Sequence, residues 1–251
     1  MAMLRRQKAT IVALALYWPT LFVLAHIPVP EVVRRAGMSD KSLHVLMYLI
    51  LTFLLWSALK PQSKLDWRRL APWLTLAIVL GYAACDEYLQ RFVAGRSMDA
   101  RDLVADAIGA AAALGVVSVF SFWPAALIIT GATIYTLTVF TRANLTELLP
   151  VTTTVFHLGT YGFFTLLWIA CLGRRFAVGR GDRRWLGASM IAPLGMLLVT
   201  KASALISGKA FEGWDVVAGV AGIFGTIAIY CFLARLRERA AKGPALSGAE
   251  A

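Results

Sequence analysis

Three side chains that can exchange protons or bind ions recur at helical spacing at the start of one apolar segment. Lys41, His44 and Tyr48 are three and four residues apart, so a helix would place them on one face. The same spacing also suits a histidine and a tyrosine that anchor a helix at a membrane surface. The pattern therefore indicates either a proton-carrying or ligand-binding site, or an interfacial anchor.

A second group of polar residues ends a later apolar segment. Asp86 and Glu87 are followed by Gln90, and Asp86 and Gln90 share one face if the helix continues that far. Gly95 offers a turn, and Arg96 suits a carboxylate or a phosphate because its guanidinium can bind two oxygens at once. This group predicts an acidic site with a cation beside it.

Asp99, Asp102 and Asp106 follow at spacings of three and four residues, along the start of the next apolar segment. The first two would lie where the helix dipole stabilises an anion, so they also suit a structural role as caps. Asp106 lies one turn further in, where an ionised group costs about 2.5 to 3.5 kcal/mol at the centre of a membrane helix and less near the interface. Asp106 must therefore face a polar interior, pair with an arginine or a lysine, or be protonated.

The apolar segments that carry these residues are long enough to cross a membrane. The chain is 59% hydrophobic, above the roughly 45 to 50% of soluble domains, and about 20 residues of helix cross the hydrocarbon layer. Continuous apolar runs favour helices over the alternating strands of a barrel. We predict an all-α polytopic bundle of eight membrane helices, at about 10–27, 43–59, 70–85, 103–120, 123–140, 155–172, 185–206 and 215–233.

The distribution of charge predicts the orientation of this bundle. Sixteen of the 25 lysines and arginines fall on the side of the N-terminus, whereas most acidic residues fall toward the other side. The positive-inside rule then places both termini in the cytoplasm and the polar residues described above near the outer face. The net charge of +11 follows from this topology and from anionic inner-leaflet lipid, so we expect no nucleic-acid partner.

An internal repeat relates the two halves of the chain by a shift of 113 residues without a gap. The matched pairs include His44 with His157, Tyr48 with Tyr161, Gly95 with Gly208, Asp102 with Asp215, and Gly109 with Gly222. We predict two parallel four-helix repeats, with the full polar motif in 1–121 and a degenerate copy in 122–238, followed by a disordered cytoplasmic tail at 239–251.

The second copy lacks most of the acidic residues of the first. Asp86 and Glu87 correspond to Val199 and Thr200, and Asp106 corresponds to Gly219. We therefore expect the second copy to form a wall for the site of the first copy rather than a second site. The three cysteines, Cys85, Cys171 and Cys231, have no paired spacing and lie in or at the end of apolar runs, which supports neither a disulfide framework nor a metal motif.

The polar residues of the first half resemble the motif of the VanZ-like family, with Arg96 to Gly109 as the most specific part. Asp106 departs from the asparagine usual in that family. The resemblance covers about residues 10–120 and implies a four-helix unit of a bacterial cell-envelope protein in the cytoplasmic (inner) membrane. Some family members are linked to glycopeptide (teicoplanin) resistance, but the resemblance supplies no established reaction.

Three functions fit these residues. The first is an outward-facing site that binds or processes an envelope lipid or a lipid-linked saccharide, using cations for phosphate and carboxylates for acid/base work. The second is a proton-coupled transporter or lipid flippase, and the third is a non-catalytic membrane partner of an envelope assembly whose protein partners are unknown. Whether bound lipid is processed is left open by the residues.

For the first function we assign candidate roles to named side chains. The catalytic candidates are Asp86, Glu87, His44 and Asp106. The substrate-binding candidates are Lys41, Tyr48, Gln90, Arg96, Asp99, Arg101 and Asp102. No cofactor is expected, with a divalent cation at Asp86, Glu87 and Asp102 as the alternative.

Overall fold

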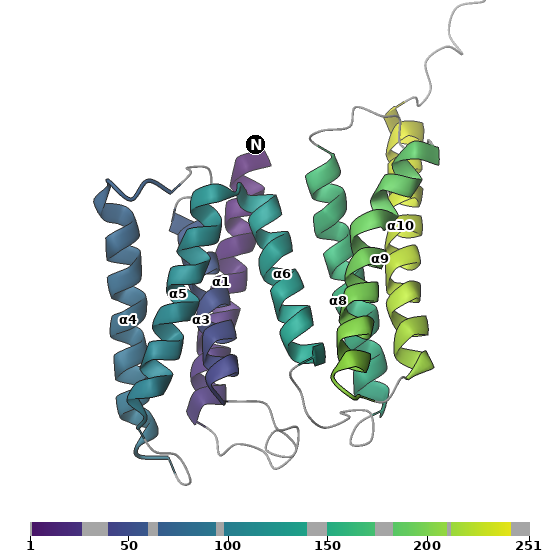
Figure 1. Ribbon diagram of the computed structural model, residues 1–251. Helices are drawn as coiled ribbons and strands as arrows, with labels where there is room; N and C mark the ends of the chain where they lie inside the picture. The colour runs from purple at the N-terminus through teal and green to yellow at the C-terminus, as the bar shows by residue number, and fades with distance from the viewer. Residues whose placement is uncertain are drawn as a thin grey trace, which may run out of the picture. The chain divides into compact units, whose positions relative to one another are not determined.

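A computed structural model describes residues 2–26, 40–59, 65–93, 98–139, 150–173, 183–209 and 212–241. Within these ranges all regular secondary structure is helical (Figure 1). Eight of the described helices are long and apolar enough to cross a membrane. The prediction of an all-helical membrane protein is therefore confirmed for the described residues.

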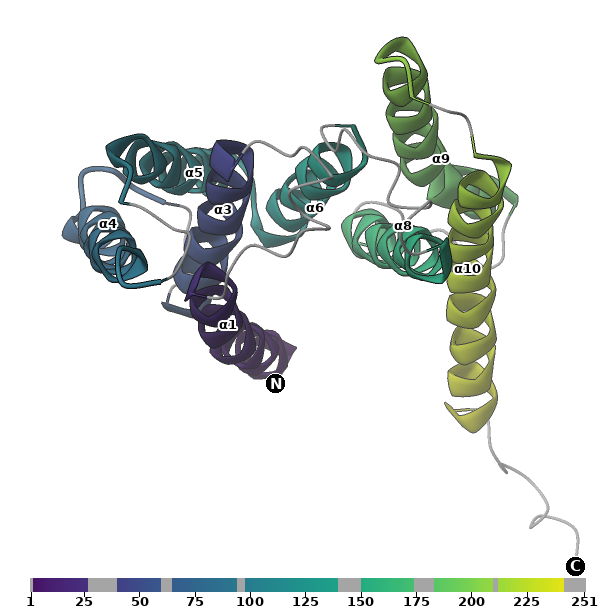
Figure 2. The same ribbon diagram turned by 90° about the horizontal axis from the view of Figure 1, so that it is seen from below.

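The first of two compact units spans residues 1–148. Its helices are α1 (Ala2–His26), α3 (Asp40–Leu59), α4 (Leu70–Gln90), α5 (Ala100–Val119) and α6 (Phe122–Val139). Helix α3 is central in this unit, because it contacts α1, α4, α5 and α6 (Figure 2). The end of α1, the start of α3, the end of α4 and the start of α5 meet at one end of the unit, which brings the predicted polar residues together (Figure 1).

An apolar core joins α1, α3, α4 and α5 next to that polar end. Leu21, Leu51, Val79 and Ala110 are buried there, and the ring of Tyr48 is packed among them. Several hydroxyl groups inside the helices bond to the carbonyl one turn earlier, as Thr75 does to the oxygen of Ala71 at 2.9 Å. The buried hydroxyl of Thr52 in α3 makes no such bond to the described residues. Such bonds let a hydroxyl be buried among apolar side chains without losing its hydrogen bond.

Gly109 sets the close approach of α5 to α3. A Cβ atom at this position would collide with the carbonyl oxygen of Val45 and would lie 3.0 Å from the amide nitrogen of Leu49. Small residues let helix backbones approach in membranes, where dispersion contacts rather than hydrophobic burial hold helices together. Because Gly109 lies one turn after Asp106, this contact brings the Asp106 carboxylate within reach of α3.

The second compact unit spans residues 149–251. It contains α8 (Pro150–Leu172), α9 (Arg183–Ile206) and α10 (Gly213–Ala241), and α10 packs along α8. Helix α9 ends in a turn at Gly208, whose φ of +76° is a conformation that glycine adopts without strain. The amide of Lys209 then donates to the carbonyl of Ala204 at 3.0 Å and closes the helix end.

The same backbone contact occurs in both units. A Cβ atom on Gly222 of α10 would collide with the carbonyl oxygen of Leu158 on α8. Gly222 and Leu158 are each 113 residues after Gly109 and Val45, which is the relation that a duplication requires. Helix α6 packs on α3 and α5 and so lies in the first unit, whereas the sequence repeat begins its second copy at residue 122.

The repeat boundaries and the duplication stay predictions. Helix α10 continues to Ala241, so the first residues of the predicted tail at 239–251 are helical. The rest of that tail, from residue 242 onward, lies outside the described residues.

Candidate functional site

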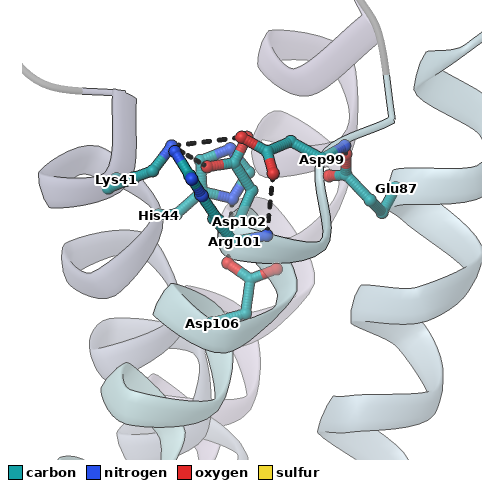
Figure 3. Close-up of polar contacts among 7 residues, drawn as sticks. All are labelled: Lys41, His44, Glu87, Asp99, Arg101, Asp102 and Asp106. Carbon is teal, nitrogen blue, oxygen red and sulfur yellow. Dashed lines mark hydrogen bonds and ion pairs between the residues drawn. The ribbon is translucent and has the colours of Figure 1, made fainter.

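Lys41, near the start of α3, holds two aspartates at the start of α5. Its ammonium nitrogen lies 3.2 Å from Asp99 Oδ2 and 3.2 Å from Asp102 Oδ1 (Figure 3). Asp99 also caps α5, because its Oδ1 accepts a hydrogen bond from the amide of Arg101 at 2.9 Å. The capping role expected for Asp99 is therefore confirmed, and Lys41 joins α3 to the same helix end.

The bond from the Arg101 amide is the largest cause that holds the pKa of Asp99 below its usual value, and Lys41 lowers this pKa further. The Asp99 carboxylate is therefore ionised at neutral pH and is available to Lys41 as a full negative charge.

One turn along the same face, His44 meets Asp106 inside the unit. The Nδ1 atom of His44 lies 2.9 Å from Asp106 Oδ1, and the two residues are only 2% and 1% exposed. Asp106 is thus paired with a histidine rather than with the arginine or lysine that its position in the sequence allows. A buried carboxylate without such a partner would carry a large desolvation cost.

The end of α4 contributes three buried polar side chains. Gln90 Nε2 donates to Asp86 Oδ2 at 3.1 Å, which confirms that the helix continues far enough to place both on one face. Glu87 Oε1 accepts a hydrogen bond from the backbone amide of Asp99 at 2.6 Å. Glu87 therefore ties the end of α4 to the start of α5, across the segment that contains Arg96.

Two oxygens of these acids accept no hydrogen bond from the described residues. They are Asp86 Oδ1 and Glu87 Oε2, in residues that are 3% and 2% exposed. Ionised carboxylate oxygens only accept hydrogen bonds, so each of these atoms needs a donor. The hydroxyl of Tyr48, 1% exposed, is likewise without a hydrogen-bond partner. The cluster therefore has unused hydrogen-bonding capacity on two helices.

His26 is a member of the cluster that the sequence analysis missed. Its Nδ1 atom lies 3.6 Å from Asp86 Oδ1 and 2.8 Å from the carbonyl oxygen of Phe22. The imidazole also stacks on the Phe22 ring, with centroids 4.1 Å apart. The available signal was that His26 is one of only three histidines and ends an apolar run.

The structure brings most of the predicted site residues together, and Arg96 is not among the described residues. Lys41, His44, Glu87, Asp99, Arg101, Asp102 and Asp106 lie at one end of the first unit (Figure 3). The role of Arg96 therefore stays a prediction. Within the described ranges no three His, Cys, Asp or Glu side chains are grouped as metal ligands would be. The divalent cation at Asp86, Glu87 and Asp102 remains a prediction from sequence.

The second unit holds a smaller polar cluster. Asp215 Oδ2 lies 2.9 Å from the ammonium nitrogen of Lys201 on α9, and Asp215 Oδ1 lies 3.7 Å from Nδ1 of His157. His157 Nδ1 is closer, at 2.9 Å, to the carbonyl oxygen of Thr153. The Tyr161 hydroxyl pairs with that of Thr200 at 2.6 Å. Here one buried carboxylate is neutralised by one lysine.

The match with a protein family covers the first of these clusters. Residues 8–121 match the family described as VanZ/LLP1. Residues 8–121 form a VanZ-like domain. No curated protein and no solved structure matched the chain. The VanZ-like domain contains α1 from Lys8 onward and all of α3, α4 and α5, so it includes the complete described cluster.

Proposed function

We propose that the VanZ-like domain binds a membrane lipid or a lipid-linked saccharide and that its buried acids act on the bound headgroup. The observation that carries this proposal is that two buried oxygens at the polar end of a membrane bundle, Asp86 Oδ1 and Glu87 Oε2, accept no hydrogen bond from the described residues. His26 Nδ1, at 3.6 Å from Asp86 Oδ1, is beyond hydrogen-bond distance. A headgroup with hydroxyls supplies the missing donors, as saccharides and glycerol do. Buried polar groups that lack partners favour a ligand that provides them.

The same cluster offers groups for acid/base chemistry. His44 and Asp106 form a buried contact of 2.9 Å, and Glu87 is buried on the neighbouring helix. A histidine oriented by a carboxylate is a common proton acceptor, and a buried carboxyl group can return the proton. In this proposal Lys41 and Arg101 hold the charged part of the ligand, while His44, Asp86, Glu87 and Asp106 contact its hydroxyls.

We further propose that this site faces the outside of a bacterial inner membrane, with both termini in the cytoplasm. The excess of basic residues on the side of the N-terminus supports this orientation. An outward site on an envelope lipid would link the domain to glycopeptide resistance of the teicoplanin type. Expression in a susceptible host, with teicoplanin susceptibility as the readout, tests that link.

The direct test follows lipid chemistry in proteoliposomes made from a bacterial polar lipid extract. New lipid products are quantified by liquid chromatography and mass spectrometry for the wild type, Asp86→Asn and Glu87→Gln. Loss of a positioned acid or base costs roughly a hundredfold or more in rate, so both variants should fall to background. The matched control is Asp66→Asn, which removes an aspartate at the opposite end of the α4 region.

A transporter or lipid flippase is a second candidate, because two histidines contact buried acids. His26 lies near Asp86, and His44 bonds Asp106, so a proton path could use both pairs. Proton-coupled movement of lipid without new products would favour this candidate. Unchanged products, transport and susceptibility in Asp86→Asn and Glu87→Gln would instead favour a non-catalytic partner of an envelope assembly.

A further inference from the structure

A groove of about 530 Å³ opens between α3 and α5, beside the polar cluster. This volume lies within the range of about 300 to 1,000 Å³ that is typical of ligand sites. The groove walls are almost entirely apolar. Its lining includes Lys41, Val45, Arg101, Val104, Ala105 and Ile108.

The apolar part of the groove lies on a side of α5 that the unit leaves uncovered. Val104 and Ile108 are 59% and 55% exposed, and both lie in the candidate membrane span Ala100–Val119. Apolar side chains exposed along a membrane helix face lipid chains. A lipid chain can therefore enter the groove sideways from the bilayer, without passing through the polar end of the unit.

The polar end of the groove carries two cationic side chains, Lys41 and Arg101, and only the first is in an ion pair among the described residues. The Lys41 ammonium already contacts Asp99 and Asp102, each at 3.2 Å. The Arg101 side chain is exposed, and among the described residues its guanidinium makes no hydrogen bond or ion pair; only its backbone amide is engaged, by Asp99. A guanidinium binds phosphate oxygens in pairs, which makes Arg101 complementary to a phosphate.

We propose that this groove binds an anionic phospholipid, with one acyl chain along Val45, Val104 and Ile108 and the phosphate at Arg101. The inference rests on the proposed function, because it names the lipid class of that site and its path from the bilayer. Lys41 is shared by the groove and the polar cluster, so a headgroup held at Arg101 lies next to Asp99 and Asp102. In this arrangement the groove binds the lipid phosphate and one acyl chain, and the polar cluster contacts the rest of the headgroup.

The test measures lipid binding to the full-length protein in detergent by native mass spectrometry. The probes are dioleoyl phosphatidylglycerol and dioleoylglycerol, which share both chains and differ in the charged headgroup. The wild type should bind the phosphatidylglycerol at least about tenfold more tightly, because a charged hydrogen-bonded contact is worth about that factor. Equal affinity for the two lipids in the wild type would overturn the inference.

Two pairs of variants locate the binding. Arg101→Gln should abolish the preference for phosphatidylglycerol, whereas Arg91→Gln, an exposed arginine beyond α4 that contacts Tyr88, should keep it. Ile108→Trp should fill the groove and weaken both lipids, whereas Val119→Trp, at an exposed position at the far end of α5, should weaken neither. Equal losses in Arg101→Gln and Arg91→Gln, or in the two tryptophan variants, would contradict a site in this groove.

The proposed function fails in a different way from this inference. Asp86→Asn should form no lipid product, while its remaining preference for phosphatidylglycerol should still be lost on adding Arg101→Gln. If the wild type binds phosphatidylglycerol selectively but forms no product, the groove is supported as a lipid site and the proposed processing of lipid is contradicted. If Arg101→Gln forms product at the wild-type rate, the proposed processing of lipid is supported and the groove is contradicted as the lipid site. Circular dichroism and size-exclusion profiles that match the wild type establish that each variant is folded.

Discussion

The two units pair aspartates that the predicted repeat aligns, Asp102 and Asp215, with lysines from different helices. In the first unit Asp102 pairs with Lys41 of α3, and in the second unit its counterpart Asp215 pairs with Lys201 of α9. The residue equivalent to Lys41 is Thr154, and the residue equivalent to Lys201 is Tyr88. The cation therefore comes from a different helix while the acid keeps its place.

The two polar clusters differ in which atoms lack a hydrogen-bond partner among the described residues. In the first unit these atoms include two carboxylate oxygens, whereas in the second unit the buried carboxylate is paired with a lysine and the atom without a partner is His157 Nε2. Besides Asp102, the first unit has Asp86, Glu87 and Asp106, and two of these carboxylate oxygens accept no hydrogen bond from the part of the chain that the structure describes. The second unit has Gly219 in place of Asp106, and its one buried acid contacts a lysine at 2.9 Å. Ligand chemistry is thus expected from the first unit, while the polar groups of the second stabilise helix packing.

The largest expected effect tests the contact that both units share. Gly109→Ala and Gly222→Ala should each destabilise the protein by about 3 kcal/mol, because the new methyl group meets a backbone carbonyl and overpacking is costly. Thermal unfolding in detergent measures the loss. Gly115→Ala is the control, since a Cβ atom there meets nothing within 4 Å. A loss in only one of the two units would break the structural equivalence.

A smaller effect tests the cation that neutralises Asp215. Lys201→Met should cost about 2 kcal/mol in unfolding free energy, because it leaves a buried carboxylate without its ion-pair partner. Lys41→Met should cost less, since the Lys41 side chain is 45% exposed. Adding Thr154→Lys to Lys201→Met should restore stability if the two units are equivalent at this position. If the double variant is no more stable than Lys201→Met, then α8 cannot supply the cation as α3 does.

A smaller effect again is expected at Asp106, an acid that the second unit replaces with Gly219. Asp106→Asn should change the unfolding free energy by less than about 1 kcal/mol, because the amide keeps a hydrogen bond to His44 at nearly the same volume. Chemical denaturation in detergent checks this value. A loss as large as that of Lys201→Met would instead show that His44 and Asp106 form a charged pair on which folding depends.

The smallest effect is the pH dependence of the start of α5. The folded pKa of Asp99 is lowered, first by the Arg101 amide and then by Lys41. The stabilisation from ionised Asp99 is therefore fully present above its unfolded pKa, near 3.8, and is lost as the pH falls through the lower folded pKa. The stability difference between the wild type and Asp99→Asn should shrink when unfolding is measured at pH 3 instead of pH 7. A difference that grows on acidification would contradict the lowered pKa.

Much of the helical architecture could be predicted from the sequence. The eight apolar runs predict the eight helices because crossing hydrocarbon requires long continuous segments with internally bonded backbones. The spacing of Lys41, His44 and Tyr48 fixed their common face, and the position of Asp99 before a helix predicted its capping bond. These are local properties, set within one or two turns of a helix.

Only the tertiary structure decided which helices meet. The contact of His26 with Asp86, the choice of Lys41 or Lys201 as the cation, and the packing of α6 in the first unit join segments far apart in the chain. Spacing along a helix fixes a face but not the neighbour that the face contacts. That neighbour depends on close approaches such as the one at Gly109, where the absence of a side chain sets the distance between two backbones.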